Sequence, residues 1–405
     1  HTENEPQGVA LAWTGWRDVG MATRGSIEKV FEEAGIETVS VENGVNLFVD
    51  EVMCGGKRKV VIAGQLGVLN DDGSDRKPPQ RLSPEVSALM EDAKRFPFVE
   101  KIVSHEDFDQ LTYECTLDVN RYPFLIDHAI DGVPYHPGVM ALEMFAEAAQ
   151  LLWPPCTVIG FNDVKFGLPV KLLHDEQKVR VVANFSKQDD DNVWISCHLE
   201  SDLINKSGET FGEPRVHHEG IVRMLKVGAD RGLLHLPSIG IPAQDGTPDN
   251  PDFIYKRFFH GPKFQSHGGI ICGCQIEEMQ GIDGIALNRN QLPDTNLFAD
   301  GMMKLEAQPM LIEACFQNAG MAAMEVDELQ SLPIGIDHVE LIRKSEKNDT
   351  LRIRTLRIGG DEGGITNHDG LIINQNGKPV LALNGLRLKG MAPLSDAEKF
   401  TLNRN

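Results

Sequence analysis

The chain has 405 residues, of which 41% are hydrophobic and 24% are charged. At roughly 100–200 residues per domain, this length predicts two to four domains, and the composition is that of globular proteins rather than disordered ones. The 60 acidic residues exceed the 39 basic ones, for a formal net charge of -21. We therefore expect no nucleic-acid partner, because phosphate binding needs clustered Lys and Arg. No apolar run reaches the roughly 18–20 uncharged residues that span a bilayer, so we expect no membrane partner either.

The seven cysteines are scattered along the chain, which favours a reducing cytosol over a disulfide framework. We therefore expect a cytoplasmic protein. Cys272 and Cys274 form the closest pair, but no second pair of ligands accompanies them, so we expect no metal site. The chain opens HTENEPQG without an initiator Met, which predicts a portion of a longer protein.

Residues 1–72 have the pattern of the end of an α/β unit. The alternation of apolar strands with helices predicts parallel strand pairing. No Gly-rich phosphate loop follows a strand, so the usual dinucleotide fingerprint is missing from this stretch. The expected strands are Ala10–Trp13, Glu37–Val41 and Lys59–Ala63, and the expected helices are Ser26–Ala34 and Asn43–Met53.

Two stretches with little regular pattern divide the rest of the chain. Residues 73–97 form a polar, Pro-containing linker that ends in a short helix, and residues 228–251 form a second linker. Two blocks of similar size remain, 98–227 and 252–395, followed by a tail at 396–405.

Each block has one long amphipathic helix among alternating strands. The helices are expected at Gly138–Leu152 and Pro309–Val326. The Asn376-Gly377 pair signals a hairpin, because both central positions of its turn need positive φ. One helix wrapped by a mainly antiparallel sheet, made twice, predicts an α+β protein with a double hot-dog fold. The strands are expected near Tyr113–Val119, Lys178–Phe185, Val193–Ser201 and His217–Leu225 in the first block and near Leu351–Ile358, Leu371–Asn374 and Val380–Leu388 in the second.

The most specific local pattern is PFLIDHAIDGVPYHPG at Pro123–Gly138, which contains H-x-x-x-G-x-x-x-x-P through His128, Gly132 and Pro137. It predicts a loop histidine, a tight backbone approach at the glycine, and a proline that leads into a helix. Gly138 then begins that helix, where unpaired N–H groups can hold a carbonyl oxygen. The alternative is a surface histidine beside an ordinary helix start.

A second pattern lies on the later helix, in PMLIEACFQNAG. Glu313 and Gln317 are four residues apart and share one helical face, so Gln317 can orient the carboxyl group. Apolar neighbours are expected to raise the pKa of Glu313 by desolvation, which would make it an acid near neutral pH. The alternative is an ordinary solvated glutamate.

The third pattern is RFFHGPKFQ at Arg257–Gln265, where Gly261-Pro262 is a turn signal and aromatic residues line an apolar surface. Together and in this order, the three patterns resemble the dehydratase domain of modular and iterative polyketide synthases over roughly residues 98–395. The fold of that family is a double hot dog.

The resemblance implies dehydration of 3-hydroxyacyl thioesters to 2-enoyl thioesters on an acyl carrier protein, with no cofactor. His128 would be the base that takes the α-proton, Glu313 the acid that protonates the β-hydroxyl, and Gln317 the residue that holds Glu313. Many members have Asp in place of Glu313 and Tyr in place of His260. The implied substrate-binding residues are Gly132, Pro137, Gly138, His260, Gly261, Pro262 and Phe264.

Residues 1–72 resemble the carboxyl-terminal part of a ketoreductase domain, and a ketoreductase followed by a dehydratase is similar to polyunsaturated fatty acid synthases. The expected partners are therefore a carrier protein domain and neighbouring synthase domains, and the resemblance allows a homodimer. Two alternatives stay open: another hot-dog activity, either an isomerase or a thioesterase, and an inactive pseudo-dehydratase that only organises its neighbours.

Overall fold

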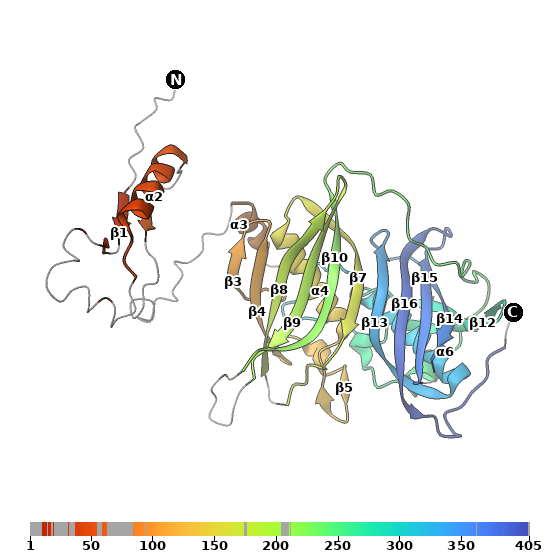
Figure 1. Ribbon diagram of the computed structural model, residues 1–405. Coiled ribbons are helices and arrows are strands. Elements are labelled where there is room, and N and C mark those ends of the chain that lie inside the picture. The colour runs from red at the N-terminus through yellow and green to blue at the C-terminus, as the bar shows by residue number, and fades with distance from the viewer. Residues whose placement is uncertain are drawn as a thin grey trace. The chain divides into compact units, whose positions relative to one another are not determined.

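The structure is a computed structural model that divides into two units, His1–Arg81 and Leu82–Asn405 (Figure 1). Each unit is described by itself. The described residues are 10–13, 15–17, 19, 31, 37–54, 59–62, 84–92, 94–173, 176–203, 210, 212–361 and 363–403.

In the first unit, β1 (Ala10–Trp13) pairs with β2 (Lys59–Ile62) in parallel, which confirms the predicted pairing. The strand predicted at Glu37–Val41 is wrong. Only Val39 forms a bridge there, with Trp16, because α2 (Val41–Cys54) already begins at Val41. The Ser40 hydroxyl accepts the Asn43 N–H at 3.3 Å and caps that helix. Apart from residue 31, the predicted helix Ser26–Ala34 lies outside the described residues.

The second unit is built on a 12-stranded antiparallel sheet in the order β11-β12-β14-β15-β16-β13-β7-β10-β9-β8-β4-β3. Its strands are β3 (Lys101–Glu106), β4 (Gln110–Asp118), β7 (Cys156–Phe166), β8 (Glu176–Gln188), β9 (Asn192–Ser201), β10 (Arg215–Lys226), β11 (His267–Ile276), β12 (Met279–Ala286), β13 (Leu329–Leu341), β14 (Leu351–Gly360), β15 (Ile365–Ile373) and β16 (Pro379–Pro393). The helices are α3 (Pro84–Met90), α4 (Gly138–Leu152), α5 (Asp252–Tyr255) and α6 (Pro309–Asp327), with short turns η3 (Pro123–Leu125) and η4 (Pro262–Phe264) and a small hairpin of β5 (Ala129–Ile130) and β6 (Val133–Pro134).

The sheet contains one topology twice. Reading inward from either edge, each half runs through its first, second, fourth, fifth, sixth and third strand in chain order, and the two third strands, β7 and β13, pair in the middle. We call the half with α4 the first hot dog, the half with α6 the second hot dog, and the β7–β13 pair the seam. A Cβ on Gly160 would lie 2.1 Å from the Val339 carbonyl oxygen, so this close pairing requires glycine. The fold is the double hot dog that was predicted.

Each half of the sheet curves across its own helix, as Figure 1 shows for α4 and α6. The predicted helix bounds are confirmed to within one residue. The prediction that these helices are amphipathic is wrong, because a hot-dog helix is enclosed by its sheet. Every side chain of α4 after Gly138 is buried. Its polar groups are used internally, since Glu143 accepts the N–H groups of Glu306 and Ala307 at 2.7 and 2.8 Å.

Five strands of the 12-stranded sheet, β3, β7, β11, β12 and β13, are missing from the sequence-based prediction. Glycines interrupt the apolar pattern of β11 and β12, and Pro333 with Gly335 interrupts that of β13, where the pairing register shifts. The hairpin between β15 and β16 is confirmed, but its turn differs. Gly377 has a φ of 71° while Asn376 does not have a positive φ, because the Asn374 side chain accepts the N–H groups of Asn376 and Lys378 at 3.0 and 2.9 Å.

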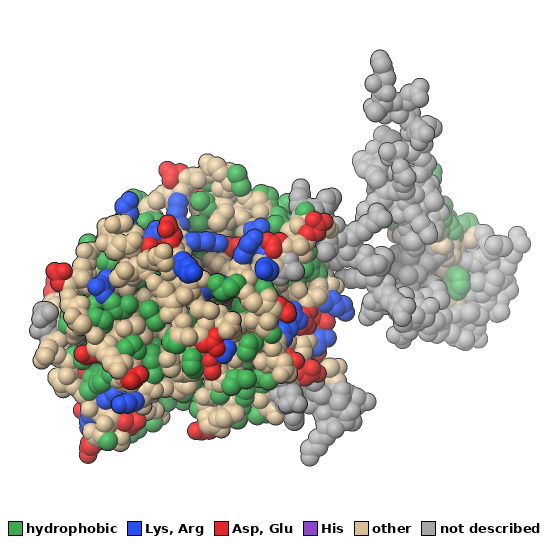
Figure 2. Space-filling view, turned by 180° about the vertical axis from the view of Figure 1, so that it is seen from behind, with side chains coloured by type: hydrophobic (Ala, Val, Ile, Leu, Met, Phe, Trp, Pro, Cys, Tyr) green, Lys and Arg blue, Asp and Glu red, His purple; other side chains and the backbone are tan. Residues whose placement is uncertain are grey.

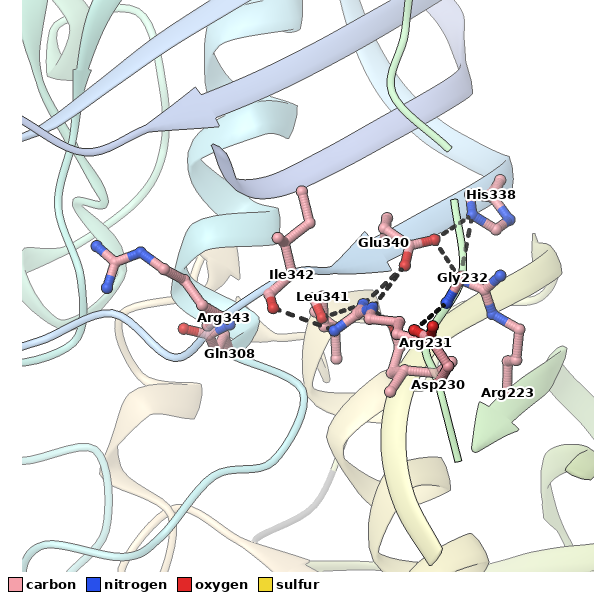
Figure 3. Close-up of polar contacts among 11 residues, drawn as sticks. Arg223, Asp230, Arg231, Gly232, Gln308, His338, Glu340, Leu341, Ile342 and Arg343 are labelled. Carbon is pink, nitrogen blue, oxygen red and sulfur yellow. Dashed lines mark hydrogen bonds and ion pairs between the residues drawn. The ribbon is translucent and has the colours of Figure 1, made fainter. Parts of the chain in front are cut away.

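A buried ion cluster fastens the linker after β10 to the seam (Figure 3). Glu340 on β13 is 2% exposed and accepts hydrogen bonds from Arg223 on β10 and Arg231 in the linker. The Arg231 guanidinium also donates to the carbonyl oxygen of Ile159 on β7 at 3.0 Å and to that of Ile342, which directly follows β13, at 3.1 Å. Arg231 therefore contacts both strands of the seam. Among the described helices, none is long and apolar enough to cross a membrane.

Candidate active site

The β5–β6 hairpin holds His128. Asp131 and Gly132 have φ values of 51° and 79°, the two left-handed positions of a two-residue hairpin turn. The turn brings Tyr135 back to His128, where the Tyr135 N–H donates to the His128 carbonyl and His128 Nδ1 donates to the Tyr135 carbonyl, both at 2.9 Å. Since a carbonyl only accepts, Nδ1 carries the proton and Nε2 is left to accept one. Gly132 itself lies at the exposed tip, where it serves the turn.

Pro137 and Gly138 begin α4. Pro137 is the N-cap residue in an extended conformation, and Gly138 is the first helical residue. A Cβ on Gly138 would lie 2.7 Å from Cε1 of Phe166, so only glycine lets that ring pack against the helix start. The first N–H groups of a helix have no acceptor within it, and they provide donors at this point.

Asp127 connects the first hot dog to the loop that carries His260. The Asp127 carbonyl accepts the Gly261 N–H at 2.8 Å, and its carboxylate accepts the Lys263 N–H at 2.8 Å. A Cβ on Gly261 would lie 2.5 Å from Asp127 Oδ1, so this approach also requires glycine. The His128 ring consequently lies 5.4 Å from the His260 ring. Pro262 then opens η4 with its fixed φ, and η4 ends at Phe264.

Glu313 and Gln317 reach the same place from α6 in the second hot dog. Glu313 Oε1 lies 3.2 Å from His260 Nε2 and accepts a hydrogen bond from Gln317 Nε2 at 2.9 Å. Gln317 Nε2 also donates to the Phe264 carbonyl at 2.7 Å. On its other side, the Tyr255 hydroxyl donates to Gln317 Oε1 at 2.7 Å. Gln317 is thus held from both ends and in turn holds Glu313.

The electrostatics of the two groups differ. Burial, and then the neighbouring His260, lower the pKa of His128 to about 4, although Glu313 opposes this. His128 is therefore neutral near neutral pH. Burial raises the pKa of Glu313, but hydrogen bonds from His260 and Gln317 together with the nearby His128 outweigh it, and the pKa lies below its ordinary value. The predicted rise is wrong because His260, His128 and Gln317 together outweigh the effect of burial.

The sequence patterns that carry the predicted residues meet in space, although the structure gives those residues different tasks. His128, His260, Glu313 and Gln317 share one hydrogen-bonded or ring-contact cluster, while Gly132, Gly138 and Gly261 permit backbone geometry. The Phe264 ring packs 5.3 Å from the His128 ring. Sequence reasoning missed Asp127 and Tyr255. The only signal for Asp127 is its position next to His128.

Two cavities lie apart from this cluster. One of about 210 Å³ is lined by the aromatic rings of Phe96, Tyr122 and Phe298, and one of about 110 Å³ lies at the start of α6, near Pro309 and Leu311. Neither cavity is lined by His128, His260, Glu313 or Gln317. Within the described part of the chain, no group of three or more His, Cys, Asp and Glu side chains is placed to hold a metal ion.

Two family models match the second unit. The polyketide synthase dehydratase domain matches residues 97–200, and the polyketide synthase dehydratase N-terminal domain matches residues 255–397. The two matched stretches together take in more than half of the chain. The chain belongs to the polyketide synthase dehydratase family. No curated protein sequence matches it.

Solved structures of polyketide synthase dehydratases share the fold. The dehydratase domain from the CurF module of curacin polyketide synthase is 15% identical with a TM-score of 0.55, and the match covers 73% of this chain and all of that one. The corresponding domain from the CurJ module is 19% identical with a TM-score of 0.53, covering 74% of this chain and 98% of that one. The dehydratase domain of a mycocerosic acid synthase-like polyketide synthase is 17% identical with a TM-score of 0.53, covering 73% and 97%.

Proposed function

We propose that the chain removes water from 3-hydroxyacyl thioesters to form 2-enoyl thioesters. The observation that supports this most is the meeting of two proton-transfer groups from different hot dogs. His128, with Nδ1 tied to Tyr135 and Nε2 available, lies beside the His260–Glu313 pair. A dehydration needs such a pair, because one group must take the α-proton while another protonates the departing hydroxyl.

In this proposal His128 Nε2 accepts the α-proton. Its lowered pKa keeps the imidazole neutral at physiological pH, so the lone pair is available without prior loss of a proton. The hydrogen bond from Nδ1 to the Tyr135 carbonyl fixes the ring and the tautomer, and it stabilises the imidazolium that forms.

Glu313 is the proposed acid at the hydroxyl, with Gln317 holding its carboxyl group. The thioester carbonyl gains negative charge as the α-proton leaves, and the amide N–H groups at the start of α4 are the proposed donors to it. Gly138 is suited to this task because it has no side chain to cover those groups. The reaction uses no cofactor in this scheme.

We further propose that the substrate arrives on the phosphopantetheine arm of a carrier protein domain, within a cytosolic synthase that includes neighbouring domains such as a ketoreductase. Figure 2 shows one face of the protein, on which Lys and Arg side chains are mixed with Asp and Glu. Lys263 is engaged by Asp127 and Asp294, and Lys165 is engaged by Glu219. Lys171, whose ammonium lies 5.3 Å above the Tyr135 ring, is the best placed to meet an acidic carrier.

The test uses the whole chain with a 3-hydroxyacyl N-acetylcysteamine thioester, and mass spectrometry follows formation of the enoyl product. We expect turnover by the native protein and a loss of about 100-fold or more in His128→Ala. His198→Ala is the matched control, because His198 is likewise half-buried but lies on β9. Unchanged turnover in His128→Ala would refute the proposal. Release of free thiol without an enoyl product would indicate a thioesterase, and a product with a moved double bond would indicate an isomerase.

A further inference from the structure

The side-chain amide of Gln317 has a direction that matters for Glu313. Its Nε2 donates to Glu313 Oε1 at 2.9 Å and to the Phe264 carbonyl at 2.7 Å, while its Oε1 accepts the Tyr255 hydroxyl at 2.7 Å. If the amide were turned over, its oxygen would face the Phe264 carbonyl, which can only accept, and both bonds from Nε2 would be lost. The orientation of this amide therefore decides whether Gln317 can donate a hydrogen bond to Glu313.

The Tyr255 hydroxyl faces the amide oxygen of Gln317, and its own proton has a defined direction. The hydroxyl oxygen accepts the backbone N–H of His267 at 2.8 Å, and a backbone N–H can only donate. A hydroxyl has a single proton to give. The Gln317 oxygen at 2.7 Å is closer to it than the other acceptor in reach, the His267 carbonyl at 3.3 Å. The proton of Tyr255 therefore points at Gln317 and keeps the amide oxygen on that side.

His267 is a fixed anchor for this series of hydrogen bonds. It begins β11, where it pairs with Ala286 of β12, and its side chain is fully buried. The Gly269 N–H donates to His267 Nδ1 at 3.1 Å, so Nε2 carries the ring proton and donates to Asn318 Oδ1 at 2.7 Å. Asn318 on α6 in turn donates to the Ile282 carbonyl on β12 at 2.9 Å. The sheet and α6 thus hold His267 in place, and with it the donor to Tyr255.

The two oxygens of the Glu313 carboxyl group have different surroundings. Gln317 Nε2 at 2.9 Å and His260 Nε2 at 3.2 Å both approach Oε1. Each carboxyl oxygen offers lone pairs for about two donors, so these two groups occupy Oε1. Among the described residues, none donates a hydrogen bond to the second oxygen, Oε2. Oε2 is therefore the oxygen that is left for the hydroxyl of a substrate.

We propose that Tyr255 is a positioning residue of this site, which determines through Gln317 that Oε2 of Glu313 meets the substrate hydroxyl. The Tyr255 hydroxyl fixes the amide of Gln317, and the amide occupies Oε1. The hydrogen bonds of the Tyr255 hydroxyl go to Gln317 and His267, so its effect on Glu313 passes through Gln317. The inference rests on the proposed function, because it assigns the oxygen through which the acid of that reaction acts.

The first test removes the hydroxyl of Tyr255 and keeps its ring. In Tyr255→Phe, Gln317 loses the donor that fixes its amide. We expect kcat for the 3-hydroxyacyl N-acetylcysteamine thioester to fall about fivefold or more, with KM within about twofold of native, because the acid is displaced while substrate binding is kept. Tyr113→Phe is the matched control, because the buried Tyr113 hydroxyl donates to the Met144 carbonyl at 3.0 Å within the first hot dog. That control should keep native kcat.

A double-mutant cycle tests whether Tyr255 acts through Gln317. Gln317→Ala removes the amide, so we expect it to lower kcat at least as much as Tyr255→Phe does. Adding Tyr255→Phe to that variant should change kcat by less than about twofold, because the hydroxyl then has no amide to orient. A larger further loss would show that Tyr255 acts independently of Gln317, and it would overturn the inference. A fall in kcat of less than about fivefold in Tyr255→Phe alone would overturn it as well.

The orientation of the amide can also be measured in the native protein, without any substitution. Gln317 Nε2 has two acceptors in the orientation that Tyr255 imposes, so NMR should show its protons exchanging with deuterium about 10-fold or more slowly than those of Gln188, which is exposed at the end of β8. A smaller difference overturns the inference. Such results leave the proposed dehydration intact if the native protein forms the enoyl product and His128→Ala does not. A native protein that forms no enoyl product removes both proposals.

Discussion

The ion cluster at the seam allows a stability prediction with a defined size. Glu340 is 2% exposed and receives hydrogen bonds from His338, Arg231 and Arg223 (Figure 3). Burial alone would raise the pKa of Glu340, but these three donors lower it from 4.5 to about 2. In Glu340→Gln the negative charge is lost while the shape of the side chain is kept. Two guanidinium groups then remain with no carboxylate partner in the cluster.

The magnitude follows from linkage between protonation and folding. A pKa that is lowered by about 2.5 units on folding corresponds to about 3 kcal/mol of stability, at about 1.4 kcal/mol per unit. Because the folded-state pKa is the lower one, this stability is fully present above the unfolded value near 4.5. It is lost as pH falls toward 2. Removal of one partner of a buried ion pair has a typical cost of about 3–5 kcal/mol, in agreement with this figure.

Thermal unfolding at pH 7, followed by calorimetry, measures the effect. With an unfolding entropy of about 2 cal/mol/K per residue, a loss of about 3 kcal/mol lowers the Tm of the second unit by about 5 °C. Glu219→Gln is the control, because Glu219 pairs with Lys165 while its side chain is 46% exposed, and such pairs contribute under about 1 kcal/mol. If Glu340→Gln and Glu219→Gln lowered the Tm equally, the reasoning about the buried cluster would be refuted.

Three further predictions concern the site. Asp127→Ala should lower kcat about 10-fold or more while Tm stays within about 2 °C of native, because the carboxylate positions the His260 loop without touching substrate. A native kcat in this variant would contradict that role. Gly138→Ala should lower the free energy of unfolding by about 1–3 kcal/mol and should also lower turnover, because its Cβ would lie 2.7 Å from Phe166. Native stability together with native turnover would show that the Phe166 ring moves aside. The kcat/KM profile should be flat from neutral pH down to about 5 and fall below about 4, since His128 has a pKa of about 4 and must be neutral to accept a proton. A fall that begins near pH 6.5 would show that His128 titrates as an ordinary imidazole.

The two helices were predictable from the sequence because their starts carry strong local signals. Gly138 follows Pro137, Pro309 is itself the first helical residue, and long apolar runs follow in both. The repeated arrangement of one helix among strands followed from these helices and from the regular strands between them. Strands rich in glycine or broken by Pro333 were not predictable, because their pairing is decided by partners that lie far along the chain.

Motif spacing also indicated which segments meet at the site, but not what their residues do. The sign of the pKa shift of Glu313 depends on His260, which lies 53 positions earlier and contacts it only after α6 has packed into the second hot dog. Likewise, Asp127 looks like an ordinary loop residue until the Gly261 N–H is found bonded to its carbonyl. Local patterns predict local structure, whereas protonation depends on neighbours that the fold supplies.

The seam has a consequence for how such a protein can be rearranged. Because the proposed base is carried by one hot dog and the proposed acid by the other, neither half contains a complete reaction centre. Duplication of one half, or exchange of one half for that of a relative, would have to preserve the glycine contact at Gly160 and the Asp127–Gly261 bond to bring the two groups into register. The two halves are therefore constrained to change together, as one inherited unit.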